Sequence, residues 1–283
     1  MFRRRHPIAM VVLVALAALP AAAHEYWLQP GRYSASVGDT VIVNAFVGEG
    51  FTGARLAYDP SRAERLTMHA AGAPRDLAHA WRPAAGAIMG CAVAPDDSGA
   101  VVAYLSRFTS IEIEPDRFDA YLREEGLDGP LAARAALPER GGAGRERYRR
   151  CAKTWISPGR NGLGAQRATG PVGLPLEIVP LGDPVTSRPL RLEVRFQGAP
   201  LAGALVRAWH APLDTGGQPL DCGRRDPTEV AAEGRTDAHG RVELRLDAAG
   251  EWLIGTVHMV PCQEPAVADW ESYWASLTFA TPR

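Results

Sequence analysis

Residues 183–283 consist of short apolar runs separated by turns that contain glycine or proline, and this pattern most constrains the fold. The runs are rich in β-branched and aromatic side chains, which favour strands. Strands that follow one another without intervening helices are typical of an antiparallel sandwich. We therefore predict that this segment is a β-sandwich with strands at residues 190–196, 204–210, 241–246, 252–258 and 276–279.

The residues before this segment mix strands with helices. Residues 40–46 and 100–106 are mostly β-branched or apolar and predict two strands. Pro115 favours the first turn of a helix, apolar side chains follow on one face, and Gly126 can end the helix. The pattern predicts two further helical segments with solvated charged sides, at residues 131–137 and 145–155.

A stretch without periodicity separates the two parts of the chain. Residues 157–175 are rich in Gly, Pro and Arg, which is typical of an exposed connecting segment, and residues 176–180 then resume extended structure. We therefore predict a mainly β protein of two β-sandwich domains. The first domain, residues 24–182, contains the helical insertion, and the second is residues 183–283.

The amino terminus has the parts of a secretory signal. Residues 3–5 are all Arg, residues 8–19 are apolar, and residues 21–23 are all Ala. Residues 1–23 are thus predicted to be a signal peptide, and cleavage after Ala23 would export the chain to the periplasm with His24 as its first residue. No later apolar run approaches the roughly 18 residues of a spanning helix, so we expect no membrane span after signal removal.

The charge balance and the cysteines restrict the partners and the redox setting. The formal net charge of −1 leaves no basic footprint and predicts no nucleic-acid partner. The chain has four cysteines, an even number that can pair completely as disulfides in the oxidising compartment expected for it. Three pairings are possible, and we favour Cys91 with Cys151 and Cys222 with Cys262, because each pair would close a loop within one predicted domain.

A histidine at the mature terminus predicts a metal site. The α-amine has an unperturbed pKa of about 7.7 to 8, so a metal ion can displace its proton, and the amine and Nδ1 of His24 can then chelate one ion. Nitrogen donors favour Ni²⁺, Co²⁺, Cu²⁺ and Zn²⁺ over Mg²⁺ and Ca²⁺. We expect His258 as the next ligand, with His210 or Glu25 behind it.

Each of these residues also has a simpler structural interpretation. Strand alternation places His258 beside Ile254 and Trp252, and His210 beside Val206 and Ala208, so both can be half-buried residues at the edge of a core. The adjacent carboxylates Glu124 and Glu125 are interpreted as solvated side chains near a helix end, and no hydrolase, zinc-helix or phosphate-loop motif is present. The protein is therefore expected not to be an enzyme.

Five segments in the same order resemble the DUF4198 family of exported bacterial proteins, whose relatives include periplasmic nickel-uptake accessory proteins: residues 23–30, 118–127, 147–154, 176–181 and 269–279. The resemblance implies a nickel- or cobalt-binding protein that works with an inner- or outer-membrane metal transporter, with copper and zinc as other possible ions. Residues 198–206 and 236–240 also resemble transthyretin-like and carboxypeptidase-regulatory-like β-sandwich modules, so we expect the second domain to be transthyretin-like or immunoglobulin-like.

Two other functions remain open from the sequence. A copper brace with an N-terminal histidine is the core of oxidative polysaccharide-cleaving enzymes, although those need a second brace histidine. A non-catalytic envelope or adhesion scaffold is the other alternative, because exported all-β folds commonly serve as scaffolds and fold does not dictate function.

Overall fold

The computed structural model describes residues 24–70, 72–78, 98–137, 142–158 and 169–281, together with the backbone of residues 90–93. The predicted signal peptide, residues 1–23, lies outside these ranges, as do residues 159–168 of the predicted connecting segment. Within the described residues, no helix is long and apolar enough to cross a membrane.

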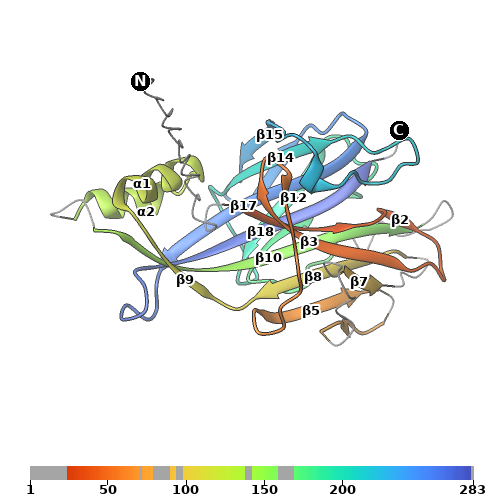
Figure 1. Ribbon diagram of the computed structural model, residues 1–283. Helices are drawn as coiled ribbons and strands as arrows, with labels where there is room; N and C mark the ends of the chain where they lie inside the picture. The colour runs from red at the N-terminus through yellow and green to blue at the C-terminus, as the bar shows by residue number, and fades with distance from the viewer. Residues whose placement is uncertain are drawn as a thin grey trace, which may run out of the picture.

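A large twisted sheet forms the centre of the molecule (Figure 1). Its ten strands are mostly antiparallel, but β10 and β18 run parallel to each other. The path across the sheet is β15 (Val230–Arg235), β14 (Leu205–Ala211), β17 (Gly250–Pro261), β18 (Trp270–Thr281), β10 (Gly144–Pro158), β8 (Ala100–Ser106), β5 (Ala63–His69) and β6 (Arg75–Asp76), while β2 (Ser34–Ala35) and β9 (Thr109–Ile113) also pair with β10.

Two smaller sheets pack against the central one, which confirms the predicted mainly β sandwich architecture. The first, called here the amino-terminal sheet, contains β1 (Glu25–Pro30), β3 (Val41–Glu49), β4 (Thr52–Leu56) and β7 (Gly90–Val93). The second, called the covering sheet, contains β11 (Leu176–Pro180), β12 (Leu190–Phe196), β13 (Ala199–Pro200) and β16 (Arg241–Leu244).

Strand alternation gives the central sheet two different faces. On β17, Trp252 and Ile254 point into the core shared with the covering sheet, whereas Leu253 points into a core on the opposite face. The amino-terminal sheet covers that opposite face. Each side of the central sheet thus has its own packing partner, and residues two apart on a strand share a face.

Strand β1 packs against the central sheet, and its side chains belong to two separate hydrophobic cores. Leu28 packs into one core with strands β5, β8 and β10, while Trp27 packs into another with Trp209 of β14 and Leu253 of β17. The hydroxyl of Thr278 on β18 donates a hydrogen bond of 2.5 Å to the backbone oxygen of Leu28. The position of β1, and with it of the chain's predicted mature end, is therefore fixed by packing on both sides.

Two short helices cover one end of the long strands (Figure 1). They are α1 (Pro115–Glu124), which confirms the helix predicted between Pro115 and Gly126, and α2 (Asp128–Ala135), which overlaps the helical segment predicted at residues 131–137. Phe118 and Leu122 of α1 pack on Val257 and Trp274 of the central sheet. The helices lie on the same face as the amino-terminal sheet.

The helix predicted at residues 145–155 is wrong, because this segment is the long strand β10. Its charged side chains looked solvated in the sequence, but they find partners on other elements instead. Arg147 pairs with Glu271 at 2.5 Å, Arg149 pairs with Glu64, and the buried Lys153 pairs with Glu177 at 2.7 Å. These long-range ion pairs permit a strongly charged strand in the middle of a sheet.

Strands from both predicted domains share the central sheet. Strand β10 precedes residue 183 and pairs along nine positions with β18, which follows it. The predicted boundary at residues 182 and 183 falls between β11 and β12, which also pair with each other. The division into two independently folding domains stays a prediction.

The disulfide Cys222–Cys262 is wrong in this structure, where Cys151, Cys222 and Cys262 are all buried free thiols. Cys222 lies in the core below β1, whereas the thiol of Cys262 contacts Glu264 and Glu271 at the far end of β17. Cys151 points into the core below the covering sheet, while Cys91 belongs to a strand of the amino-terminal sheet on the opposite face. The side chain of Cys91 lies outside the described residues, and Cys151 is unpaired.

Candidate functional site at the start of β1

His24 directly precedes β1 and is half-buried. Strand β1 begins with Glu25, which pairs with Gly48 of β3. Nδ1 of His24 is buried and has no hydrogen-bond partner among the described residues. A buried polar atom of this kind normally has a partner, so this imidazole nitrogen is a candidate donor to a ligand.

The carboxylate of Glu25 is also incompletely partnered. Its Oε2 atom is buried and has no hydrogen-bond partner in the described part of the chain. Burial raises the pKa of Glu25 to about 7, and the nearby Glu49 raises it further, while Arg150 and Arg207 oppose the shift. Consecutive residues therefore present an imidazole nitrogen and a readily protonated carboxylate oxygen, both without partners.

The end of helix α1 brings a second carboxylate to this region. Gly126, with φ of +64°, adopts the left-handed conformation just after the helix, and a Cβ atom there would come within 3.1 Å of Leu205. The helix end thereby sits close to β14, where Arg207 Nη1 lies 3.3 Å from Glu125 Oε2. Burial raises the pKa of Glu125 to about 8 despite this arginine, and the charge of Glu25 adds to the shift.

A small cavity of about 20 Å³ lies between these elements. Its walls come from β1, the end of α1, β14, β17 and β18 and mix polar with apolar side chains. The lining includes Glu25, Tyr26, Glu125, Arg207 and Trp274. A cavity needs roughly 10 to 15 Å³ of this kind of space to hold one water molecule. The space therefore suits a single water or ion and excludes an organic molecule.

His258 and His210 lie on the other face of the central sheet. His258 has the same parity on β17 as Trp252 and Ile254, and its ring packs edge-on against Phe196 of the covering sheet, with ring centroids 4.5 Å apart. Burial lowers the pKa of His258. The structure therefore does not bring His258 to His24.

The two strand histidines are also far from each other. His210 pairs with Trp252 of β17, six positions before His258, which corresponds to roughly 20 Å along a strand. A ring nitrogen of His210 is 3.0 Å from the backbone oxygen of Ala249. Across the described ranges, no group of three or more His, Cys, Asp or Glu side chains is arranged to hold a metal ion. His24 and Glu25 are neighbours in the chain, and the structure brings neither His258 nor His210 to them.

The model of the family "Domain of unknown function (DUF4198)" matches residues 21–260, which include His24, Glu25 and the cavity residues of β1, the end of α1, β14 and β17, but not those of β18. The chain belongs to the DUF4198 family. The match spans both predicted domains, in agreement with the shared central sheet.

Two solved structures illustrate what this DUF4198 protein is similar to. The D0-D1 domain of Intimin is 10% identical, with a TM-score of 0.19, over 91% of this chain and 98% of that chain. The adhesin InvE of Yersinia pseudotuberculosis is 10% identical, with a TM-score of 0.22, over 92% of this chain and 59% of that chain. These TM-scores are too low to carry an argument. No curated protein matches the chain.

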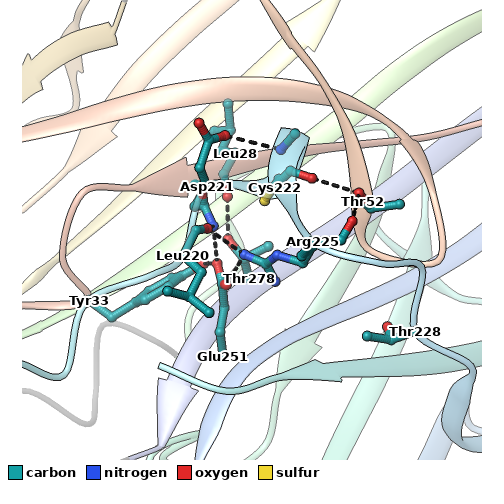
Figure 2. Close-up of polar contacts among 12 residues, drawn as sticks. Leu28, Tyr33, Thr52, Leu220, Asp221, Cys222, Arg225, Thr228, Glu251 and Thr278 are labelled. Carbon is teal, nitrogen blue, oxygen red and sulfur yellow. Dashed lines mark hydrogen bonds and ion pairs between the residues drawn. The ribbon is translucent and has the colours of Figure 1, made fainter. Parts of the chain in front are cut away.

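The other end of β1 in this DUF4198 protein holds a second polar cluster, shown in Figure 2. Glu251 is completely buried, and both of its oxygens accept hydrogen bonds. Oε1 accepts from Gln29 Nε2 at 2.8 Å and from the Tyr33 hydroxyl at 2.7 Å, and Oε2 accepts from Arg225 Nη2 at 2.9 Å. The guanidinium of Arg225 lies 4.8 Å from the centre of the Phe51 ring. This cluster ties the loop that contains the short 3₁₀ turn η2 (Cys222–Arg224) to the sheets.

Glu125, Arg207 and Arg150 are site residues that the sequence reasoning missed. Glu124 is exposed, as predicted for both neighbouring carboxylates, but the side chain of Glu125 is only 13% exposed. The helical period offered a signal, because Glu125 lies four positions after the buried Tyr121 and therefore on the same face. For Arg207 and Arg150, only the pairing of distant strands reveals the location.

Proposed function

We propose that this protein is exported to the periplasm, loses residues 1–23, and captures a transition-metal ion with its new amino terminus. The observation that carries the proposal is that Nδ1 of His24 and Oε2 of Glu25 are buried on consecutive residues and lack hydrogen-bond partners among the described residues. Both atoms are metal donors, and a bound cation would supply the partner that each lacks.

The donor set determines which ions fit. The free amine and Nδ1 of His24 close a chelate ring around one ion, and Glu25 adds a carboxylate oxygen. Two nitrogens and one oxygen favour a borderline ion over Mg²⁺ or Ca²⁺, and nickel or cobalt is the cargo that we propose, with copper or zinc as competitors. Metal binding must release protons, because the amine and Glu25 are both substantially protonated near pH 7.

The local structure suits transient binding. Glu25 is held by its pairing with β3, whereas His24 lies just outside the strand, so its backbone is not held by that pairing. The described residues add no cluster of further protein ligands that would enclose the ion. An incomplete protein coordination shell allows another protein to take the ion, and we propose a membrane metal transporter as that partner.

Calorimetric titration of the chain that begins at His24 with Ni²⁺, Co²⁺, Cu²⁺ and Zn²⁺ tests this proposal. A matched form carries one extra Ala before His24, which keeps the imidazole but separates it from the free amine. The form with the extra Ala loses the amine as a direct ligand. Loss of a residue that only hydrogen-bonds to a metal ligand weakens metal binding by about 10- to 100-fold, so this form should bind nickel at least that much more weakly. Equal affinities for the two forms would contradict the terminal chelate.

A further inference from the structure

The donors found in the described part of the chain leave a bound ion incompletely coordinated. The amine and Nδ1 of His24 with one oxygen of Glu25 are three donors, and the described residues supply no metal cluster beyond them. Ni²⁺ and Cu²⁺ favour square-planar or tetragonal sets, in which at least four donors surround the ion. At least one coordination position is therefore open to a donor that does not come from the described part of the protein.

A groove next to this terminus has the size of a small organic ligand. It has a volume of about 460 Å³ and lies between the amino-terminal sheet and strands β8 and β10 of the central sheet. Pockets for small molecules have volumes of roughly 300 to 1,000 Å³. Four tyrosines and two arginines contribute to its walls: Tyr26, Tyr58, Tyr104, Tyr148, Arg62 and Arg150.

Tyr26 connects the groove with the metal-binding end of the chain. It directly follows Glu25 in β1 and lines both the groove and the small cavity that Glu25 also lines. Its ring stacks on that of Tyr104, with centroids 5.1 Å apart and planes 25° apart. A planar molecule in the groove would thus lie against an aromatic wall one residue away from the chelating pair.

The charges of the groove favour an anion. Arg150 is 5% exposed, and its guanidinium lies 4.9 Å from the centre of the Tyr148 ring and 4.8 Å from that of Trp274. Arginine stays protonated in proteins, so this is a positive charge inside the groove. Arg62 is balanced by Asp59, 3.4 Å away at the exposed edge. A carboxylate bound in the groove would accept hydrogen bonds from arginine and tyrosine side chains in place of water.

We infer that the cargo is a metal ion already bound by a small planar carboxylate chelator, with the chelator in the tyrosine-lined groove and the ion at His24 and Glu25. This inference rests on the proposed function, because it assigns the open coordination positions of the same ion. On binding, the amine, the imidazole and Glu25 replace water molecules on the ion, and these waters and the displaced protons leave to solvent. The chelator remains coordinated throughout.

Three titrations of the chain that begins at His24 test the inference, with Ni²⁺ alone, pyridine-2,6-dicarboxylate alone, and their 1:1 complex. The dicarboxylate is planar and occupies three positions on the ion, which leaves positions for the three protein donors. We expect the complex to bind at least about tenfold more tightly than Ni²⁺ alone, and the chelator alone to bind more weakly than the complex. Calorimetry measures the three dissociation constants directly.

Groove variants separate the two proposals. Tyr58→Ala and Arg62→Ala should weaken binding of the complex several-fold and leave binding of Ni²⁺ alone unchanged. Arg32→Ala is the matched control, because Arg32 is also an exposed arginine paired with an aspartate, 3.5 Å from Asp39, but it lies outside the groove. This control should change neither titration.

The outcomes are distinguishable. If Ni²⁺ alone binds through the terminal chelate but the complex binds no more tightly, or the chelator removes the ion from the protein, the groove inference is wrong and the metal-capture function stands. Chelator binding as tight as that of the complex would also overturn the inference, because the ion would then be irrelevant to it. If neither Ni²⁺ nor the complex binds, the proposed function itself fails.

Discussion

Two glutamates with opposite surroundings lie at the two ends of strand β1: the half-buried Glu25 in the strand itself and the buried Glu251 of β17 beside Gln29. Near the end of the strand, both oxygens of Glu251 accept hydrogen bonds, and the carboxylate lies 2.9 Å from Arg225 (Figure 2). At its beginning, Oε2 of Glu25 has no partner among the described residues, and burial raises the pKa of Glu25 to about 7. One end of β1, called here the saturated end, thus adjoins a carboxylate whose two oxygens both have partners, although Nε and Nη1 of Arg225 have none among the described residues. The other end, called the unsaturated end, holds a carboxylate with an unpartnered oxygen.

This difference separates a structural role from a binding role. A buried carboxylate whose partners are all supplied by the protein holds distant segments together, as Glu251 holds β1 and the loop around η2. A buried carboxylate without partners destabilises the fold unless a proton or another cation neutralises it. The unsaturated end of β1 is therefore the end at which we place the ligand.

The largest effect is expected from Glu251→Ala at the saturated end. The side chain of Arg225 is only 8% exposed, and the change leaves its guanidinium without the carboxylate partner. Removal of one partner of a buried ion pair destabilises the folded state by about 3–5 kcal/mol. Urea unfolding measures the loss, and nickel affinity should stay unchanged. A loss below about 1 kcal/mol would mean that this cluster does not hold the loop.

Glu25→Gln at the other end should give the reverse result. The substitution removes an ionisable group that is disfavoured by burial, so the free energy of unfolding should stay the same or rise. Nickel affinity should fall by about 10- to 100-fold, because a direct oxygen donor is lost. Calorimetry and urea unfolding on the same preparation check both parts. A less stable variant with unchanged nickel affinity would erase the distinction between the two ends of β1.

The pH dependence of stability sharpens the comparison further. The folded-state pKa of Glu125 is raised to about 8, above its ordinary value, so between about pH 5 and about pH 8 the folded protein holds a proton that the unfolded chain releases. The contribution of this bound proton to the stability of the folded protein is complete near about pH 5 and is lost as the pH rises to about 8. The free energy of unfolding of the metal-free protein should therefore decrease as pH rises through this range. In Glu125→Gln this decrease should be smaller by on the order of 1–2 kcal/mol.

The neighbouring glutamate provides the control for that experiment. Glu124 is exposed, so Glu124→Gln should leave the pH profile unchanged. Thermal unfolding of both variants and the parent protein across the pH range gives the comparison. Identical profiles for Glu125→Gln and the parent protein would show that this carboxyl titrates normally and that the unsaturated end is better solvated than the structure indicates.

The smallest effect is expected for His258→Ala. The ring of His258 packs against Phe196 on the opposite face of the sheet, so its removal should reduce stability by about 0.5–1.5 kcal/mol and leave nickel affinity within about twofold. Thermal unfolding and calorimetry measure the two quantities. A large loss of nickel affinity would mean that His258 reaches the ion after all.

Local patterns in the sequence predicted much of the fold. Pro115 and Gly126 mark the helix α1, and β-branched runs mark β3, β8, β12 and β17, since turn chemistry and alternation act over a few residues. The segment 145–155 was predicted incorrectly because the partners of its charges, such as Glu271 and Glu177, are distant in the sequence. Local periodicity does not contain that information.

The candidate site shows the same limit. His24 and Glu25 were recognisable because the chelating pair consists of consecutive residues next to a predicted cleavage point. The sequence could not show that β1 stands on the face of the central sheet opposite to His258. It also could not show that α1 ends at β14, where Glu125 meets Arg207.

Anomalous X-ray scattering at the nickel edge, from crystals of the chain that begins at His24 soaked with nickel, tests the central claim most directly. The account predicts a nickel peak within bonding distance of the amine nitrogen and Nδ1 of His24, with the Glu25 carboxylate alongside. Nickel bound at His258 or His210 instead, or no peak at His24 at saturating nickel, would contradict it.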